Sequence, residues 1–217
     1  MYKTVVFDLD GTLLNTLTDL ADAGNRLCQK YGWPTHERQA YRYFVGNGIP
    51  KLVERLAPAD QRTPAVLEAA LADFKRDYGQ HLRDTTAPYP GIPGMLAKLK
   101  ANGVQLAVFS NKADALAKEV VKDYFGTQYF TIVRGQMTGV APRPAAEGTN
   151  ALLQALHADP ASTLYVGDSN VDVETAHNAN LPCCGAVWGF RTREELNAAG
   201  AEYLAENSDE LYDVIMK

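Results

Sequence analysis

The chain has 217 residues and a formal net charge of −5, and 46% of its residues are hydrophobic. An acidic chain does not suit a nucleic-acid partner, because phosphate contacts need a basic face. No apolar run approaches the ~20 residues of a membrane-spanning helix, so we expect no membrane partner either. The three cysteines lack metal-ligand and disulfide spacing, which favours free thiols in a reduced, cytoplasmic protein.

Short apolar runs alternate with helical patterns along most of the chain. Strands alternating with helices are typical of a parallel sheet that helices cover on both faces, so the predicted fold class is α/β. The predicted strands are residues 5–9, 105–109, 131–133, 164–166 and 183–187, and amphipathic helices are predicted at 95–100, 113–124 and 149–156.

One interval, from about residue 17 to 81, breaks this alternation. Its apolar side chains recur at helical spacing in three stretches, residues 17–31, 49–56 and 67–78. The turn-rich stretch at 87–91 cannot continue a helix. We therefore predict a helical domain of residues 15–83, inserted into an α/β core made of residues 1–14 and 84–217.

Two carboxylates, Asp8 and Asp10, stand one residue apart directly after the first apolar run. Alternate residues of a strand point the same way, so both side chains would share one face if the strand continued. Gly11 breaks that register and lets the backbone turn over the site, with Thr12 beside it. Like charges this close repel unless a cation compensates them. The pair therefore indicates chemistry rather than packing.

Polar residues also follow the next two predicted strands. Ser110 and Asn111 precede a helix predicted to begin near residue 113, where a hydroxyl, an amide and backbone N–H groups can cradle a phosphate. Ser and Asn are also ordinary helix caps, so this cluster alone leaves both interpretations open. Arg143 lies between two prolines beyond the third strand. It is either a solvated loop residue or a cation that reaches anions at the strand ends.

The fourth cluster, after the strand at 164–166, contains Asp168 and Asp172. The two lie one turn apart if a helix begins near Ser169, so both can face one site. The structural alternative is an N-cap followed by a first-turn acid that the helix dipole favours. That alternative is reasonable for Asp172 by itself, but it does not explain acid clusters after two buried strands.

All four clusters fall beyond the carboxyl ends of predicted strands, where open α/β sheets bind ligands. Four carboxylates brought together there require a cation. All-oxygen surroundings suit a hard cation, and Mg2+ above all when a phosphate shares it. An acid pair, a divalent metal, a phosphate cradle and a positive side chain together predict phosphoryl transfer.

The order of these motifs resembles the haloacid dehalogenase superfamily of aspartate-nucleophile phosphatases. Residues 8–12 match its first motif, 110–112 its second and 167–172 its fourth. The resemblance implies a Rossmann-like parallel-sheet core with a helical cap domain inserted after the first strand. Residues 44–48, 52–55 and 88–91 look most like the phosphoglycolate phosphatase branch.

The resemblance also implies a role for each motif residue. Asp8 would attack phosphorus and form an aspartyl-phosphate, and Asp10 would serve as general acid and then general base. Mg2+ would bind the carboxylates of Asp8 and Asp168 and the backbone carbonyl of Asp10, and Asp172 would help to hold the metal shell. The residues assigned to phosphate binding are Gly11, Thr12, Ser110 and Asn111.

The chain departs from the family pattern at the third motif, where Arg143 stands in place of the usual lysine. Arginine keeps the charge, but its planar fork differs from the point charge of lysine. Substrate selection is expected from the cap, where Asn47 would present backbone groups to the leaving group. Lys51 and Arg55 would meet a substrate carboxylate, or they belong to a solvated helix face.

The leading interpretation is a Mg2+-dependent hydrolase of a small phosphorylated metabolite, with 2-phosphoglycolate as the first candidate. Pyrophosphatase, sugar-phosphate phosphatase and phosphomutase activities fit the same fold. A non-catalytic phosphate-binding protein is the alternative of another class, and Arg143 is the reason to retain it. A monomer and a homodimer are both compatible with the sequence.

Overall fold

The computed structural model describes residues 1–217 and contains a central six-stranded sheet in the order β5-β4-β1-β6-β7-β8. Every neighbouring pair of strands is parallel, so the predicted α/β class is confirmed. Five strands coincide with predicted runs, whereas β8 is too short for its pattern to reveal it. The strands are β1 (Thr4–Phe7), β4 (Gln105–Ala113), β5 (Phe130–Gln136), β6 (Thr163–Gly167), β7 (Cys183–Ala186) and β8 (Tyr203–Ala205).

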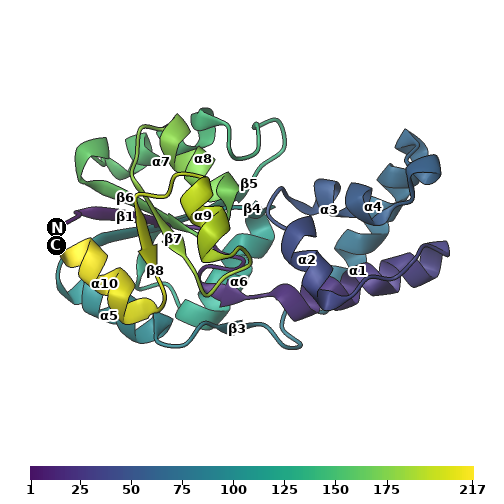
Figure 1. The fold of residues 1–217 in the computed structure, drawn as a ribbon, viewed down its shortest axis with the longest axis horizontal. Helices are drawn as coiled ribbons and strands as arrows, with labels where there is room; N and C mark the ends of the chain where they lie inside the picture. Colours follow the sequence, from purple (N-terminus) through teal and green to yellow (C-terminus); the bar gives the residue numbers. More distant parts are fainter.

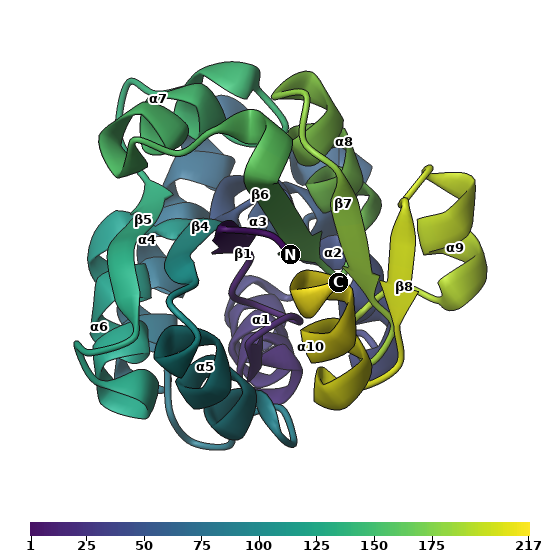
Figure 2. The ribbon, with the colours of Figure 1, turned by 90° about the vertical axis from the view of Figure 1, so that its left-hand side faces the viewer.

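Helices cover both faces of this sheet (Figure 2). In β1, Val5 and Phe7 belong to one apolar cluster and Val6 to the other, as expected when successive side chains point to opposite faces. α5 (Ile92–Ala101), α6 (Asp114–Phe125) and α10 (Ser208–Met216) pack on the first face, and α7 (Ala146–Leu156), α8 (Asn170–Asn178) and α9 (Arg193–Ala198) contribute to the second cluster. Two short 3-10 helices, Ala59–Gln61 and Pro160–Ser162, complete the helical elements.

Four helices lie together beyond the sheet, on the right of Figure 1. The chain enters and leaves them through β2 (Leu14–Asn15) and β3 (Ala87–Pro88), which pair antiparallel. The helices are α1 (Leu17–Tyr31), α2 (Arg38–Phe44), α3 (Ile49–Leu56) and α4 (Pro64–Gln80). A helical insertion after the first strand is thus present, while domain boundaries at residues 15 and 83 stay a prediction. No helix combines the length and the apolar character needed to cross a membrane.

The structure corrects the expectation that Ser110 and Asn111 sit at a helix N-terminus. Both residues belong to the extended end of β4, and α6 begins only at Asp114. The pairing of β4 with β5 shifts register between Phe109 and Ala113, and these polar residues remain buried. The strand is therefore longer than its apolar part, because its polar end still lies inside the protein.

A buried carboxylate, Asp19, ties the first turn of α1 to the segment that returns from the four helices. Its Oδ1 accepts hydrogen bonds from the backbone and the hydroxyl of Thr85, at 2.8 and 2.5 Å. Its Oδ2 does the same with Thr86, at 2.9 and 2.7 Å. Four donors thus converge on one side chain that is only 2% exposed.

Replacing Asp19 by alanine leaves these buried donors without an acceptor. We expect Asp19→Ala to lower the free energy of unfolding by about 3 kcal/mol, since hydrogen bonds to a charged group are the strong ones. Urea denaturation measures the change. The exposed Asp22 on the same helix is the matched control, and its alanine variant should change stability by less than about 0.5 kcal/mol. Equal effects of the two substitutions would contradict the assignment.

Candidate active site

The turn after β1 brings the end of the first motif into contact with the fourth motif. Gly11 has φ +92°, and a Cβ there would lie 2.3 Å from Oδ2 of Asp168, so only glycine fits. The hydroxyl of Thr12 donates to Oδ1 of Asp168 at 3.1 Å. Residues 156 positions apart in the sequence are thereby locked together. Of the two residues predicted to bind phosphate here, Thr12 holds Asp168 in this structure and Gly11 leaves room for its carboxylate.

Three buried carboxylates form a cluster at the carboxyl ends of β1 and β6. Asp8, Asp168 and Asp172 each offer an oxygen, and these oxygens lie within 4.8 Å of one another. The carboxylate of Asp10 lies outside this cluster. The expectation that four carboxylates meet is therefore corrected to three, because the side chain of Asp10 pairs with Lys112 instead.

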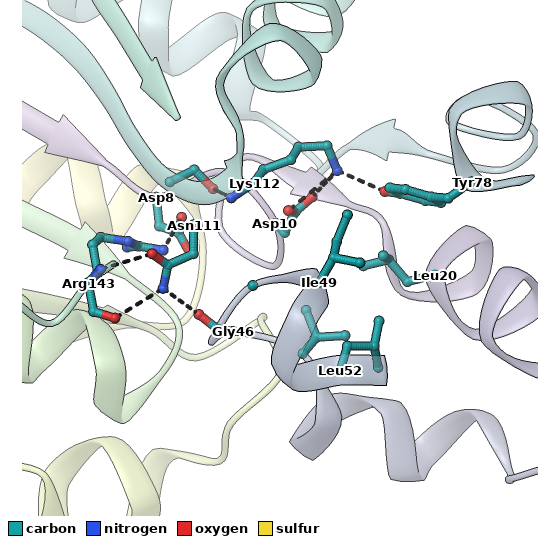
Figure 3. Close-up of a pocket in the computed structure, with 13 residues that line it drawn as sticks. Asp8, Asp10, Leu20, Gly46, Ile49, Leu52, Tyr78, Asn111, Lys112 and Arg143 are labelled. Atoms are coloured by element: carbon teal, nitrogen blue, oxygen red, sulfur yellow. Dashed lines mark hydrogen bonds and ion pairs between the residues drawn. The ribbon is translucent and has the colours of Figure 1, made fainter. Parts of the chain in front are cut away.

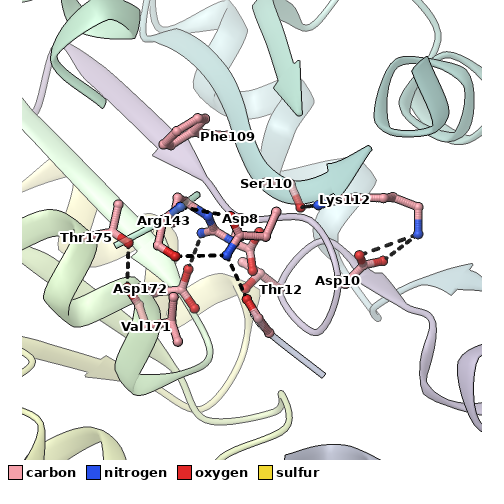
Figure 4. A network of polar contacts seen from close by, with 12 residues as sticks. Asp8, Asp10, Thr12, Phe109, Ser110, Lys112, Arg143, Val171, Asp172 and Thr175 are labelled. Atoms are coloured by element: carbon pink, nitrogen blue, oxygen red, sulfur yellow. Dashed lines mark hydrogen bonds and ion pairs between the residues drawn. The ribbon is translucent and has the colours of Figure 1, made fainter. Parts of the chain in front are cut away.

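Arg143 is buried between two of these acids (Figure 4). Its Nη2 donates to Oδ1 of Asp8 at 2.9 Å, and its Nη1 donates to Oδ1 of Asp172 at 2.6 Å. Nη1 also donates to the hydroxyl of Tyr165 at 2.6 Å. The alternative that Arg143 is a solvated loop residue is therefore wrong, because its side chain is only 2% exposed.

Asp172 satisfies both interpretations that its sequence position allows. Its Oδ2 accepts hydrogen bonds from the backbone and the hydroxyl of Ser169, at 3.0 and 2.6 Å, and completes a capping box at the start of α8. Its Oδ1 is the partner of Arg143. With both oxygens engaged, Asp172 orients Arg143 and the turn that carries Asp168.

Asp10 points into a neighbouring polar arrangement (Figure 3). Nζ of Lys112 lies 3.1 Å from Oδ1 of Asp10 and donates to the hydroxyl of Tyr78 in α4 at 2.8 Å. Burial is the largest single influence on the pKa of Lys112 and lowers it, but the charge of Asp10 and the contacts with Tyr78 together leave this pKa above its ordinary value. A cation from β4 thus holds the acid, and a phenol from the helical insertion holds that cation. Neither partner was assigned a role in the sequence analysis.

Asn111 connects three segments around the site. Its Nδ2 donates to the backbone oxygens of Gly46 and Arg143, at 2.9 and 3.2 Å, and its Oδ1 accepts from the N–H of Arg143 at 3.0 Å. The hydroxyl oxygen of Ser110 accepts from the N–H of Lys112 at 3.3 Å. Both polar side chains face the cavity that contains Asp8, and Asn111 also fastens the helical insertion to the sheet.

The cavity over Asp8 is small, with a volume of about 40 Å³. One side is polar, with Asp8, Asp10 and Arg143, and the other side is apolar. The apolar side chains come from the helical insertion and are Leu20, Val45, Ile49 and Leu52. A larger groove of about 770 Å³ adjoins it and shares Gly48, Asn111 and Arg143 with it.

The three predicted cap contacts line this outer groove rather than the inner cavity. Lys51 pairs with Glu54 at 2.8 Å on an exposed face. Arg55 donates to the backbone oxygens of Tyr43 and Phe44 and, at 2.9 Å, to Oδ1 of Asn47. Arg55 therefore supports the loop before α3. No contact of either cation reaches the carboxylate cluster.

The charges of the inner site leave room for a divalent cation. When ionised, three carboxylates together with one guanidinium sum to −2, and the ion pair of Asp10 and Lys112 is neutral. Burial raises the pKa of Asp168 to about 7, and the charge of Asp172 adds to the rise. An all-oxygen donor set with two uncompensated charges suits a hard divalent ion. The residues present therefore fit a metal such as Mg2+.

Comparison with known proteins shows the family of the chain. The sequence model of the haloacid dehalogenase-like hydrolase family matches residues 5–186 of the chain. The chain belongs to the haloacid dehalogenase-like hydrolase family. A phosphoglycolate phosphatase from Chromobacterium violaceum is 31% identical over 216 residues, which are 98% of this chain and 96% of the relative. One from Vibrio parahaemolyticus is 28% identical over 218 residues, 98% of this chain and 96% of its own.

A solved structure shares the whole architecture. A candidate phosphoglycolate phosphatase from Lactobacillus delbrueckii subsp. bulgaricus superposes with a TM-score of 0.93 at 28% identity, and the match covers 99% of this chain and 98% of that one. The family and these relatives make the chain a phosphatase, a hydrolase of phosphoric monoesters. The Rossmann-like core expected from the four motifs is confirmed.

Several residues of the site had no individual signal in the sequence. Lys112 stands inside the second motif, and its position beside Ser110 and Asn111 could have drawn attention to it. Tyr165 occupies the middle of an apolar strand, where the sequence pattern predicts only a packed core side chain. Tyr78 reads as part of the apolar stripe of a helix, and nothing in the sequence points to its hydroxyl.

Removal of Arg143 should leave two buried carboxylates without their protein cation. We expect Arg143→Ala to cost about 3–5 kcal/mol of unfolding free energy, as the loss of one partner of a buried ion pair does, and to abolish phosphatase activity. Arg143→Lys keeps the charge and should remain active. Urea denaturation in EDTA and phosphate release measure the two effects. If Arg143→Lys loses activity as fully as Arg143→Ala, equivalence of the two charges is wrong.

Proposed function

We propose that this phosphatase is a Mg2+-dependent phosphoric monoester hydrolase with Asp8 as the nucleophile and 2-phosphoglycolate as its substrate. The observation that carries the proposal is Asp8 itself. It lies within a buried acid cluster, is held by Arg143, and faces the cavity that Asp10 also lines. A carboxylate placed this way can attack one phosphoryl group while water is largely excluded.

The metal would be held by Asp8 and Asp168, with the backbone carbonyl of Asp10 as a further ligand. When bound, Mg2+ would neutralise charge on the phosphoryl oxygens and on the attacking carboxylate. The hydroxyl of Thr12 donates a hydrogen bond to Asp168, and the guanidinium of Arg143 donates one to Asp172. These contacts support direct roles for Asp8 and Asp168 and an orienting role for Asp172.

The chemistry assigned to the chain has two steps. Arg143 holds Oδ1 of Asp8, and an oxygen of that carboxylate attacks phosphorus as the bond to the ester oxygen breaks. Asp10, in its protonated form, gives its proton to the departing alkoxide and is then the carboxylate that pairs with Lys112. Asp10 then takes a proton from water, whose oxygen attacks phosphorus, releases phosphate and regenerates Asp8.

Lys112 and Tyr78 keep Asp10 in place for both proton transfers. Lys112 contacts Asp10 at 3.1 Å, and its buried bond of 2.8 Å to the hydroxyl of Tyr78 fixes the position of the ammonium group. Ser110, Asn111, Gly11 and Thr12 are proposed to surround the phosphoryl oxygens through their backbone and side-chain donors. Each of these residues lies at the carboxyl end of β1 or β4, beside Asp8.

The size of the inner cavity supports a small substrate. A volume of about 40 Å³ has room for little more than the reacting groups, and the relatives from Chromobacterium violaceum and Vibrio parahaemolyticus are phosphoglycolate phosphatases. The helices α1–α4 are proposed to act as a cap over this cavity. Asn47, Lys51 and Arg55 would act at the outer groove, where a substrate enters, rather than on the phosphoryl group.

The first test is phosphate release from a panel of esters, with Mg2+ and with EDTA. The panel contains 2-phosphoglycolate, pyrophosphate, a sugar phosphate, a sugar bisphosphate and a mononucleotide. We expect release from 2-phosphoglycolate to exceed that from every other compound and to vanish in EDTA. Equal release across the panel would reject the substrate, and full activity in EDTA would reject the metal.

The nucleophile is tested by Asp8→Asn, which is nearly isosteric but cannot attack phosphorus as a carboxylate. We expect turnover to fall by at least about 10³-fold, because covalent catalysis is lost, while circular dichroism remains unchanged. Asp22→Asn, at an exposed position, serves as the control and should keep full activity. Appreciable hydrolysis by Asp8→Asn would contradict the assignment.

A further inference from the structure

The loop after β7 fixes Asp168 through two successive peptide groups. The N–H of Phe190 donates to Oδ2 of Asp168 at 2.7 Å, and the N–H of Arg191 donates to the backbone oxygen of Asp168 at 3.3 Å. Gly189 allows this approach, because a Cβ there would lie 2.2 Å from the Cβ of Asp168. Asp168 is therefore held by the backbone of this loop as well as by Thr12.

The carbonyl oxygens of the same two peptide groups accept hydrogen bonds from one side chain of the helical insertion. Arg42, in α2, donates from Nη2 to the oxygen of Gly189 at 2.6 Å and from Nε to the oxygen of Phe190 at 2.8 Å. The C=O of Gly189 and the N–H of Phe190 belong to one peptide unit. The C=O of Phe190 and the N–H of Arg191 belong to the next. Each unit thus links Arg42 to Asp168.

The loop also donates a hydrogen bond back to helix α2. Nη1 of Arg191 donates to the backbone oxygen of Arg42, and its guanidinium lies over the ring of Tyr43, 4.9 Å from the ring centroid. Phe190 is buried in the main apolar cluster, which limits movement of the loop. Helix α2 and the loop therefore hold one another at two arginines.

A cation on a carbonyl oxygen polarises the whole peptide group and makes its N–H a stronger donor. Arg42 places one guanidinium on two consecutive carbonyls, and both N–H groups of those units point at Asp168. Loss of the guanidinium would weaken both donors and release the loop from α2. The carboxylate that the proposed metal needs would then lose part of its support.

We propose that Arg42 is a positioning residue for Asp168 and that it couples docking of the helical insertion to divalent-metal affinity. The inference rests on the proposed Mg2+ site. Supporting contacts of this kind change metal affinity by roughly 10–100-fold. Because coupling between two events is reciprocal, Mg2+ should also strengthen the contact between α2 and the loop.

The chain offers a reporter for this test in Trp188, whose Nε1 donates to the backbone oxygen of Thr12 at 3.0 Å. The chain has two tryptophans, and Trp33→Phe leaves Trp188 as the one that remains. In this background, Mg2+ is titrated without substrate, and the dissociation constant is read from Trp188 fluorescence and from calorimetry. The variants are Arg42→Ala, Arg42→Lys and, as a matched control, Arg38→Ala on an exposed position of the same helix.

We expect Arg42→Ala to weaken Mg2+ binding by about tenfold and to reduce the rise in melting temperature that Mg2+ causes. Arg42→Lys keeps the charge but has one nitrogen in place of the two that reach the two carbonyls, so its affinity should fall between those of Arg42→Ala and the parent. Its milder change also serves if Arg42→Ala does not fold. Arg38→Ala should bind as the parent does.

Two failures can be told apart in this experiment. A parent protein that binds no Mg2+ by either measurement overturns the proposed metal site itself. A parent that binds Mg2+ while folded Arg42→Ala or Arg42→Lys binds it equally well overturns the coupling and leaves the metal site intact. A loss shared by Arg38→Ala would show a general effect of charge on α2 and would also overturn the proposal.

Discussion

The ion pair of Arg143 with Asp8 and Asp172 is the constraint on which the rest of the site depends. Burial of three carboxylates so close together is strongly unfavourable without cations. One guanidinium with a side-chain exposure of 2% compensates part of that charge and leaves a net charge of −2 for a divalent ion. The same group orients Asp8 and fastens α8 through Asp172. One side chain therefore both balances the charge of the acids and positions them.

The parallel sheet explains why residues so distant in sequence meet at this point. β1 lies between β4 and β6. The chain passes from β1 to β4 and β5 on one side and then crosses back to β6 on the other, and this change of direction opens a site at the carboxyl ends of the central strands. Asp8 and Asp168 directly follow β1 and β6, and Lys112 lies in the last part of β4. The helical insertion then adds what the strands cannot supply, namely apolar walls from α1 and α3 and two polar side chains, Tyr78 and Arg42.

Sequence patterns predicted the parts that depend on local signals. Alternation of strands and helices revealed the sheet, and acid spacing revealed Asp8 and Asp168, since both are properties of short segments. The tertiary contacts had no such signal. Tyr78 and Tyr165 read as core because their rings pack while their hydroxyls bond, and Lys51 and Arg55 carry the right charge on a face that turns away from the acids. Ser110 lies in a strand because burial, rather than propensity, sets where β4 ends.

Gly11, Gly167 and Gly189 surround the acid cluster so closely that a β-carbon at any of them would lie within 2.4 Å of an atom of Asp168 or Asp172. Sensitivity to mutation is therefore not confined to residues that carry charge. Substitution of any one of these glycines by alanine would displace a carboxylate without altering any titratable side chain. Which residues the site can accept during evolution is therefore limited by these glycines, which must have no side chain, as much as by the functional groups.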